Sequence, residues 1–550
     1  MNIGQGRLDS TFLIIALGIL LGGCGDNSTS VDTEENGPNN PEFEVSDTTT
    51  INIVPGKTYQ TIRNFGGSDA WSAEFIGNWS ASVKENASQL LFSQETDDSG
   101  DPRGIGLSGW RFNIGVGRGQ LEGSGYATSS WYRVEECFMN LDGTWDWDRQ
   151  KGQRWFLNEA KAYGVDQFTG WINSPPYFMT KNGYTFRTNE VSGYNLDPEN
   201  YADYAEFIAG VASHFEEQGT PFDVISPVNE PQYGWQFQPG NAKQAGSYAS
   251  NMEIANLTRV IDSAFTAENV DSQIMIPEAG AVDHLYEGRA SQTTNQIHAF
   301  WNPGSDLYLG DLSNLSPYVA GHSYWTNTTV SATVNSRTKL LEQLNSTDPN
   351  LEFWQTEYSI LGADYLQGDT RADLNPIDYA LWISRIIHYD LTVANATSWS
   401  FWSVFNNSDY RDHRFRFGLI QWTPDVDNRS TTSGTIEPVK NLWAYGNFSR
   451  FVRPGMKRIQ VDNITHSEPE AAGNNVMASA FLDVDTDEIV IVLINYSNDN
   501  QKISIPDLSV EGNWDVYITS DFRDLDHKVY DKDNVKILSK SITTLVGTLN

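Results

Sequence analysis

Two glutamates stand directly after short apolar runs that have the composition of buried strands. Residues 224–228 lead into an Asn-Glu-Pro triplet that contains Glu230, and residues 353–356 lead into Glu357. Two carboxyl groups that face each other are what glycoside hydrolysis requires, one as proton donor and one as nucleophile, about 5–5.5 Å apart in retaining enzymes. The chain has 71 Asp and Glu residues, so either glutamate alone could belong to a structural ion pair. Their matching positions favour catalysis.

This chemistry requires elements that bring two separate strand ends to one place. Between residues 63 and 449, short apolar strands alternate with amphipathic helices, and one helix is indicated by the spacing of Tyr204, Phe207, Ile208, Val211 and Phe215. Such alternation predicts a parallel sheet, and eight units would close a TIM barrel whose catalytic groups lie at the carboxyl ends of the strands. A doubly wound sheet is the alternative, but no glycine-rich phosphate-binding sequence follows the first strand. We therefore predict an α/β fold with a (β/α)8 catalytic barrel over residues 63–449.

The character of the sequence changes from about Lys457 to the C-terminus. Short strand-like runs separated by turns occupy residues 475–482, 488–496, 501–505, 514–519 and 539–546, which is typical of a β-sandwich. Residues 51–62 are also strand-like and precede the barrel. We predict an attached β-sandwich side domain that combines residues 450–550 with the N-terminal strand segment 51–62.

The N-terminus carries features of an exported lipoprotein. Residues 11–23 form an apolar run too short to cross a membrane as a stable helix, and the run ends directly before Cys24. Its Leu-Gly-Gly ending resembles the cleavage site of bacterial lipoproteins, although an ordinary signal peptide that ends near a cysteine is the alternative. We predict a lipoprotein signal peptide over residues 1–23, lipid attachment at Cys24 and a flexible acidic tether over residues 24–50. The expected location is the bacterial outer membrane, on its surface or periplasmic face, and Cys137 is left as a lone thiol.

Composition and charge exclude several classes of partner. With 36 basic and 71 acidic residues, the chain has a formal net charge of −35, which argues against nucleic-acid binding and against electrostatic docking on anionic lipid. We expect a monomer that contacts a membrane only through its N-terminal lipid anchor. No His/Cys cluster has zinc-ligand spacing, and neither a P-loop nor a Gly-x-Ser-x-Gly sequence occurs, so no metal or cofactor is expected. The 18 Trp residues suit a protein that binds sugar rings.

Eight motifs, in chain order, resemble those of glycoside hydrolase family 30, a family of retaining glycosidases with a (β/α)8 barrel. Together they cover the chain after the tether. They begin at Asn64, Trp110, Asn173, Asn229, Ile276, His322, Thr356 and Trp399. Residues 451–455 and 541–546 resemble the family's exit from the barrel and its last sandwich strand. One such motif alone is weak evidence, whereas eight in the same order are specific.

The resemblance implies a role for each residue that matches a motif. Glu230 would be the general acid/base and Glu357 the nucleophile of a double displacement through a covalent glycosyl-enzyme intermediate. Glu230 must then hold a proton near neutral pH, whereas Glu357 must be ionised and needs hydrogen-bond donors around it. Tyr324 would be such a donor, and Arg111 would lie beneath the nucleophile as a fixed positive charge. Asn229 would hydrogen-bond the sugar 2-hydroxyl, a contact that strengthens in the transition state.

Several of these residues also have a purely structural interpretation. Arg111 could be a buried ion pair, and Tyr324 could be a phenol of the core. His322 shares a face with Tyr324 and could line the site or only support it. Glu278 ends another strand, and we expect it to orient the acid/base or the asparagine beside it rather than to catalyse.

The loop after the first barrel strand and a set of tryptophans are candidates for binding sugar. Asp69 and Trp71 lie in that loop, where the far end of a sugar would bind. Further candidate platforms, about half of which we expect to be core residues, are Trp171, Trp325, Trp399 and Trp402.

The substrate follows from finer resemblances. Residues 104–108 and 145–147 look most like the endo-β-1,6-galactanase branch of the family, which cleaves side chains of arabinogalactan-type polymers, although residues 114–118 lack extra glycines expected there. Glucuronoxylan endo-β-1,4-xylanase is the alternative, because that branch holds its acidic substituent with basic residues after the eighth strand. Arg411, Arg414 and Arg416 lie there, but could equally pair with acidic residues. A surface glycan-binding lipoprotein without catalysis is disfavoured by the two glutamates. We predict a glycosidase whose partner is a polysaccharide or oligosaccharide.

Overall fold

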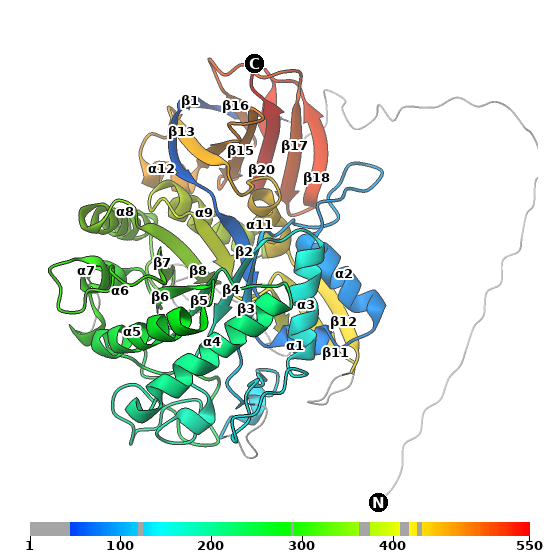
Figure 1. Cartoon of the computed structure of the whole chain (residues 1–550). Coiled ribbons are helices and arrows are strands. Elements are labelled where there is room, and N and C mark those ends of the chain that lie inside the picture. The colour runs from blue at the N-terminus through cyan, green and yellow to red at the C-terminus, as the bar shows by residue number, and fades with distance from the viewer. Residues whose placement is uncertain (1–43, 119–124, 288–290, 362–374, 408–416, 426–431) are drawn as a thin grey trace, which may run out of the picture. The chain divides into compact units, whose positions relative to one another are not determined.

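Eight parallel strands close into a barrel (Figure 1). The computed structural model describes residues 44–118, 125–287, 291–361, 375–407, 417–425 and 432–550. The barrel strands are β2 (Asn64–Ser68), β3 (Gly109–Asn113), β4 (Gln167–Trp171), β5 (Val224–Ser226), β6 (Gln273–Ala279), β7 (Leu315–His322), β8 (Glu352–Tyr358) and β9 (Ser398–Phe401). The last strand pairs in parallel with the first, which closes the barrel and confirms the predicted (β/α)8 architecture.

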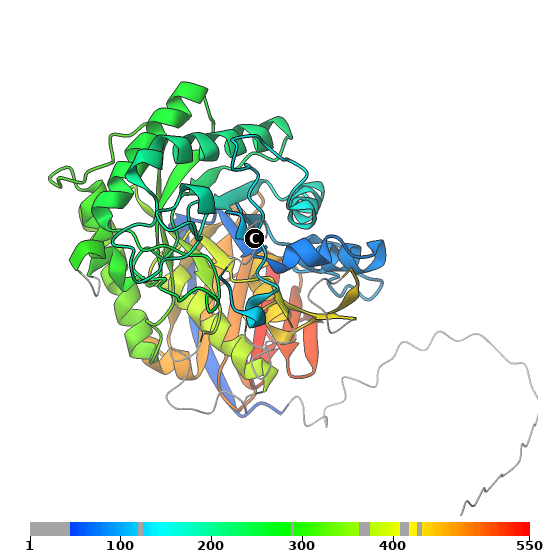
Figure 2. The same ribbon diagram turned by 90° about the horizontal axis from the view of Figure 1, so that it is seen from below.

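Helices surround the barrel because each has one apolar face to bury (Figure 2). The five apolar residues that predicted a helix by their spacing are all buried on α4. At the start of α5, Ser250 and Glu253 form a reciprocal capping box that satisfies free backbone N–H groups. The helices are α1 (Ser72–Ile76), α2 (Ala81–Phe92), α3 (Lys151–Ala162), α4 (Tyr201–Glu217), α5 (Asn251–Glu268), α6 (Asp283–Tyr286), α7 (Gln296–Trp301), α8 (Val330–Thr347), α9 (Pro376–Thr392), α11 (Lys440–Ser449) and α12 (Pro469–Asn474).

The predicted side domain is built from the C-terminal strands and the N-terminal strand β1 (Asp47–Thr61). The first residues of β1 pair in parallel with β16, and its later residues pair antiparallel with β13. Apolar residues of β16 and β19 share one core with those of β14, β15, β17 and β20. Besides β1, the strands of this domain are β13 (Lys457–Asn463), β14 (Val476–Leu482), β15 (Glu488–Asn495), β16 (Gln501–Ser504), β17 (Trp514–Ser520), β18 (Arg523–Tyr530), β19 (Val535–Ile537) and β20 (Ser541–Thr548).

Helix α11 joins the barrel to the side domain. On one side the Tyr445 hydroxyl donates to the backbone oxygen of Gly66 in β2 at 2.7 Å. On the other side the Asn447 amide donates to Thr519 in β17 at 2.7 Å, and Thr544 in β20 donates to the Asn447 backbone oxygen at 2.8 Å. A small sheet of β10 (Phe405–Asn407), β11 (Ile420–Pro424) and β12 (Gly434–Pro438) follows the barrel.

The N-terminal predictions fall mostly outside the described residues. This applies to the signal peptide, to Cys24 and to the tether up to residue 43, whereas β1 already begins at Asp47. None of the helices in the described ranges is long and apolar enough to cross a lipid bilayer. Cys137 is a buried free thiol, and burial raises its pKa to about 12, which makes it a structural residue.

Candidate active site

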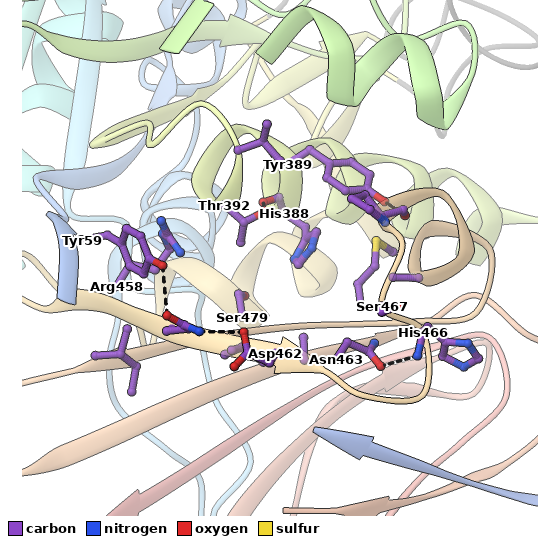
Figure 3. Close-up of a pocket in the computed structure, with 18 of the residues that line it drawn as sticks. Tyr59, His388, Tyr389, Thr392, Arg458, Asp462, Asn463, His466, Ser467 and Ser479 are labelled. Atoms are coloured by element: carbon purple, nitrogen blue, oxygen red, sulfur yellow. Dashed lines mark hydrogen bonds between the residues drawn. The ribbon is translucent and has the colours of Figure 1, made fainter. Parts of the chain in front are cut away.

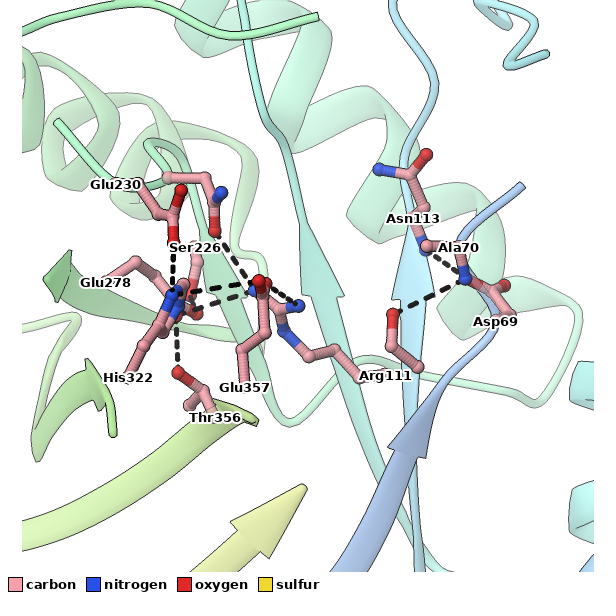
Figure 4. Close-up of polar contacts among 12 residues, drawn as sticks. Asp69, Ala70, Arg111, Asn113, Ser226, Glu230, Glu278, His322, Thr356 and Glu357 are labelled. Carbon is pink, nitrogen blue, oxygen red and sulfur yellow. Dashed lines mark hydrogen bonds and ion pairs between the residues drawn. The ribbon is translucent and has the colours of Figure 1, made fainter. Parts of the chain in front are cut away.

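The carboxyl ends of β5 and β8 bring Glu230 and Glu357 together (Figure 4). One carboxylate oxygen of each glutamate and one ring nitrogen of His322 all lie within 4.8 Å of one another. Glu230 and Glu357 keep 6% and 5% of their surface exposed, whereas His322 has none. A ligand at the barrel mouth can therefore touch both carboxylates, and the predicted convergence of the two glutamates is present.

Both carboxylate oxygens of Glu357 accept hydrogen bonds from fixed donors. Arg111 of β3 donates Nη1–H to Oε2 at 3.0 Å, and the Tyr324 hydroxyl donates to Oε1 at 3.2 Å. Arg111 also donates to Oδ1 of Asn229 at 3.2 Å, and its guanidinium lies 4.1 Å from the ring centre of Trp171. Burial, followed by the charge of Glu357, raises the pKa of Tyr324 well above its usual range, so the phenol keeps its proton and donates it. Arg111 thus forms a buried ion pair with Glu357, the proposed nucleophile.

Glu278 is a third carboxylate, and it is sealed from solvent. It accepts hydrogen bonds from Ser226 at 2.7 Å and from Thr356, and its Oε2 lies 3.0 Å from His322 Nε2 and 3.5 Å from Arg111 Nη2. Burial opposes its ionisation, but Arg111, His322 and Thr356 together lower its pKa to about 2. Glu278 thus supports its neighbours without access to substrate, but its side chain reaches Glu230, which it was predicted to orient, only through His322.

His322 lies between the three carboxylates and is fully buried. Its Nδ1 is 3.0 Å from Glu230, its Nε2 is 3.0 Å from Glu278, and Nδ1 is 3.8 Å from Glu357. Burial disfavours the charged ring, but Glu357 and the hydrogen bonds with Glu230 and Glu278 outweigh it and raise the pKa of His322 to about 10. The ring is therefore an imidazolium near neutral pH that donates from both nitrogens. It supports the site from beneath and touches the proposed acid/base.

Left-handed backbone conformations gather at the ends of the barrel strands. Non-glycine residues there with positive φ are Trp71 at 61°, Glu230 at 44°, Glu278 at 55° and Trp325 at 54°. Such residues cost about 1–3 kcal/mol each and persist where the surroundings hold them. Glu230 is held at both backbone polar groups, because its N–H donates to Glu278 O at 2.9 Å and its carbonyl accepts from Trp235 Nε1 at 3.1 Å. This clamp fixes the direction of the Glu230 side chain.

The charge on Glu357 depends on its neighbours. Burial raises the pKa of Glu357 to about 7, with the cations His322 and Arg111 lowering it and the carboxylates Glu230 and Glu278 raising it. Glu357 is thus about half ionised at pH 7, and the predicted ionised state prevails at higher pH. By distance alone, Glu230, His322 and Glu357 could also hold a metal ion. Metal binding would have to displace the proton from His322 against the charge of Arg111, so the arrangement suits proton transfer better.

Asp69 does not face the sugar site as expected. It is fully buried and accepts hydrogen bonds from the Asn113 backbone N–H at 2.9 Å and from Gln153 Nε2 at 3.1 Å. Burial raises the pKa of Asp69 to about 7, although these hydrogen bonds favour the ionised form and lower the pKa. Asp69 therefore fastens the end of β2 to β3 and α3, and its burial contradicts the prediction that it contacts substrate.

The tryptophans divide into accessible and core residues. Trp402 and Trp325 are half-buried, and Trp402 meets the rings of Trp71 and Trp171 edge to face at 5.3 and 5.4 Å. Trp71 and Trp402 line a cavity of about 60 Å³. Trp171 is 1% exposed beneath Arg111, and Trp399 is fully buried with its Nε1 donating to Asp390 at 2.9 Å. Trp171 and Trp399 are core residues rather than sugar platforms, which agrees with the expectation that about half of the four candidates are core.

Four polar residues at or near the site were not predicted. Ser226 and Thr356 hold the Glu278 carboxylate by hydrogen bonds. Ser226 could have been recognised in the sequence, because it places a hydroxyl inside an otherwise apolar strand. Arg133 lies 4.8 Å from the ring centre of Trp71 and lines the 60 Å³ cavity, but its loop carries no sequence pattern. Glu135 is 1% exposed and accepts from Asn173 at 3.4 Å. The basic residues considered for a xylanase, Arg411, Arg414 and Arg416, lie outside the described residues.

Comparison with known families assigns the chain. The sequence model for O-glycosyl hydrolase family 30 matches residues 48–415, from β1 through the whole barrel. The chain belongs to this family. The resemblance drawn from the eight motifs is confirmed, and the protein is a glycoside hydrolase.

The chain is similar to one curated protein and to two solved structures. An endo-β-1,6-galactanase of Hypocrea rufa is 21% identical over 446 residues, which cover 78% of this chain and 79% of that protein. The crystal structure of a conserved exported protein from Bacteroides fragilis is 33% identical with a TM-score of 0.83, and covers 90% of this chain and 100% of that one. The catalytic domain of xylanase C from Talaromyces cellulolyticus is 21% identical with a TM-score of 0.63, covers 91% and 100% of the two chains, and is alike in fold alone.

Proposed function

We propose that this family 30 enzyme is a retaining endo-β-1,6-galactanase. The observation that carries the mechanism is the grouping of Glu230 and Glu357, because one carboxylate oxygen of each lies within 4.8 Å of the other. Retaining glycosidases need about 5–5.5 Å between their two carboxyl groups, whereas inverting enzymes need about 6.5–9.5 Å to admit a water molecule. This close spacing supports the retaining arrangement, in which one carboxylate attacks directly.

In the first step, the Glu357 carboxylate attacks the anomeric carbon and the bond to the leaving oxygen breaks as Glu230 donates its proton to that oxygen. The product is a glycosyl ester of Glu357. In the second step, Glu230 removes a proton from water, which attacks the anomeric carbon and releases Glu357. Arg111 and Tyr324 hold the Glu357 carboxylate. We propose that Asn229, whose Oδ1 accepts from Arg111 at 3.2 Å, bonds the sugar 2-hydroxyl.

Support for galactan as substrate comes from the endo-β-1,6-galactanase of Hypocrea rufa, which the chain matches over 78% of its length. The segments 104–108 and 145–147 pointed to the same branch from sequence alone. A family member specific for glucuronoxylan would need cationic side chains that bind the acidic substituent. Comparison with β-1,6-glucan tests which sugar is recognised at the same linkage.

The deciding experiment is hydrolysis of β-1,6-galactan, glucuronoxylan and β-1,6-glucan by the purified protein, with products followed by size and by anomeric NMR. We expect galacto-oligosaccharides that first appear in the β configuration. Preferential release of xylo- or gluco-oligosaccharides would overturn the substrate, and early α product would overturn the retaining mechanism.

Two variants test the nucleophile. Glu357→Ala should abolish hydrolysis, and azide should restore part of it by forming a glycosyl azide of inverted configuration. Glu278→Ala is the matched control, because it removes a neighbouring carboxylate that does not reach substrate. Azide rescue of Glu278→Ala instead of Glu357→Ala would reverse the assignment, and equal inactivity of wild type and Glu357→Gln would favour a glycan-binding protein.

We further propose that the protein is anchored to the bacterial outer membrane through lipid on Cys24. The signal-like segment 1–23 and the 33% identity to an exported protein support export. Replacement of Cys24 by serine should move the protein from the membrane fraction to the soluble fraction of the envelope. Equal membrane association of both forms would contradict the anchor.

A further inference from the structure

A second pocket, of about 310 Å³, lies between barrel helix α9 and strands β13 and β14 of the side domain (Figure 3). Its lining shares no residue with the catalytic cluster of Arg111, Glu230, Glu278, His322 and Glu357. The volume is at the lower end of the range of about 300–1,000 Å³ found for small-molecule sites, which is space for one or two sugar rings. The lining is mostly polar, unlike the apolar contacts that usually join two packed domains.

Arg458 of β13 places a positive charge in the wall of this pocket. It is 7% exposed, its Nε–H donates to Gln60 at 2.9 Å, and its Nη2–H donates to Asn395 at 2.8 Å. Its guanidinium lies 3.8 Å from the ring centre of Tyr59. These partners are neutral, and no carboxylate among the described residues forms an ion pair with Arg458. Buried charges in proteins are usually paired, so this guanidinium lacks an anion.

Two further buried polar atoms in the wall have no partner. They are Nδ1 of His388, whose residue is 7% exposed, and Oγ of Ser479, whose residue is 1% exposed. Burial, and then the charge of Arg458, lowers the pKa of His388 to about 3, so the ring is neutral and has a hydrogen bond to give or accept. Figure 3 shows the His388 ring directed from α9 into the space above β13. Unpartnered polar groups on two facing elements mark a place for a polar ligand.

The charges around the pocket favour an anion. Lys57 adds a second cation to Arg458, and Asp462 is the carboxylate among the lining residues, held by Gln460 Nε2 at 2.7 Å. A local excess of positive charge is unusual in a chain whose formal net charge is −35. A bare inorganic anion would satisfy Arg458 but would leave most of the 310 Å³ and the polar atoms of His388 and Ser479 unused.

We propose that this pocket is a second, non-catalytic carbohydrate site that binds a hexuronate, with the sugar carboxylate on Arg458 and its hydroxyls on His388 and Ser479. The site would hold an acidic residue of a polysaccharide apart from the hydrolytic centre. This proposal does not depend on which glycan is hydrolysed, because the two sites share no residue.

The test is a ligand-observed NMR titration of the full-length protein with D-glucuronate, D-glucose, acetate and sulfate. We expect saturable glucuronate binding that is at least about tenfold tighter than that of glucose or acetate, because a charge-assisted hydrogen bond and the hydroxyl contacts act together. Arg458→Gln should weaken glucuronate binding by about tenfold or more. Ser479→Ala, which removes one unpartnered hydroxyl and leaves the fold intact, should weaken it by a few-fold.

Arg63→Gln is the matched control, because Arg63 also lies over a tyrosine ring, 5.7 Å from Tyr318, but outside the pocket. This variant should keep full glucuronate affinity, and all three variants should hydrolyse glycan as the wild type does. Equal binding of acetate or sulfate would mean an anion site without sugar recognition and would overturn the proposal. Unchanged glucuronate affinity in both Arg458→Gln and Ser479→Ala would also overturn it, by placing the sugar elsewhere.

Discussion

Replacement of Arg111 by methionine should shift the pH dependence of hydrolysis, because Arg111 is the cation nearest the proposed nucleophile. At 3.0 Å from Glu357, a unit charge contributes about 5.5 kcal/mol at an effective dielectric constant of about 20. Measured effects of one nearby opposite charge on the pKa of a carboxyl group are smaller than this energy implies, about 1–3 pKa units. The pKa of Glu357 already lies at about 7 through burial, and removing the positive charge raises it further. Since the nucleophile must be ionised, the acidic limb of kcat/KM should move up by about 1 pH unit or more.

The assay is the pH profile of kcat/KM on the preferred glycan between pH 4 and pH 9, for wild type, Arg111→Met and Arg111→Lys. The lysine variant keeps the charge but loses the second hydrogen bond, to Asn229, so its activity should fall while its acidic limb stays near that of the wild type. An Arg111→Met profile of lower height but unchanged midpoint would refute the electrostatic role and leave Arg111 with a positioning role alone.

Three further outcomes follow from the same contacts. Glu278→Gln should lower the free energy of unfolding by about 3–5 kcal/mol, since Arg111 and His322 lose a buried charged partner. The difference between wild type and variant should shrink as the pH falls from about 4.5 to about 2, because the wild-type carboxylate then takes up its proton. Urea unfolding at several pH values measures this difference. Tyr324→Phe should lower kcat/KM about 10- to 100-fold with little change in stability, because it removes one hydrogen bond to the charged Glu357. Trp399→Phe should lower the melting temperature but leave KM unchanged, whereas Trp402→Ala should raise KM, and the reverse pattern would contradict the division into core and accessible rings.

Sequence alone predicted the elements whose pattern is set by burial. Parallel strands are covered on both faces and appear as continuous apolar runs, so β5 and β8 and the glutamates that follow or end them could be located. The same holds for α4 and for strands β14, β15 and β17 of the side domain. Strands β18 and β19 were missed because they form the two edges of the sheet, where β18 exposes polar residues and β19 has three residues.

The contacts of Arg111 and Tyr324 with Glu357 were predicted, whereas the burial of other site candidates was not. Nothing in the spacing of Asp69 or Trp399 distinguishes a residue that faces substrate from one that packs inward, because both stand in strand-end motifs beside true site residues. Their partners Gln153 and Asp390 lie on helices α3 and α9, so only the packed fold reveals the burial. The cation Arg133 comes from a loop without periodicity, and its position over Trp71 depends on the course of that loop.

The charges of the catalytic cluster determine the ionisation of the proposed nucleophile, Glu357. Three carboxylates, Glu230, Glu278 and Glu357, surround two cations, Arg111 and His322, so the fully ionised cluster carries one excess negative charge. Glu278 keeps its charge because its pKa is about 2, and His322 keeps its proton because its pKa is about 10. A buried cluster is least costly when neutral, which favours the uptake of one more proton. Because the pKa of Glu357 is raised to about 7, its carboxyl group takes up a proton as the pH falls through neutrality, while the hydrogen bonds from Arg111 and Tyr324 favour its charged form.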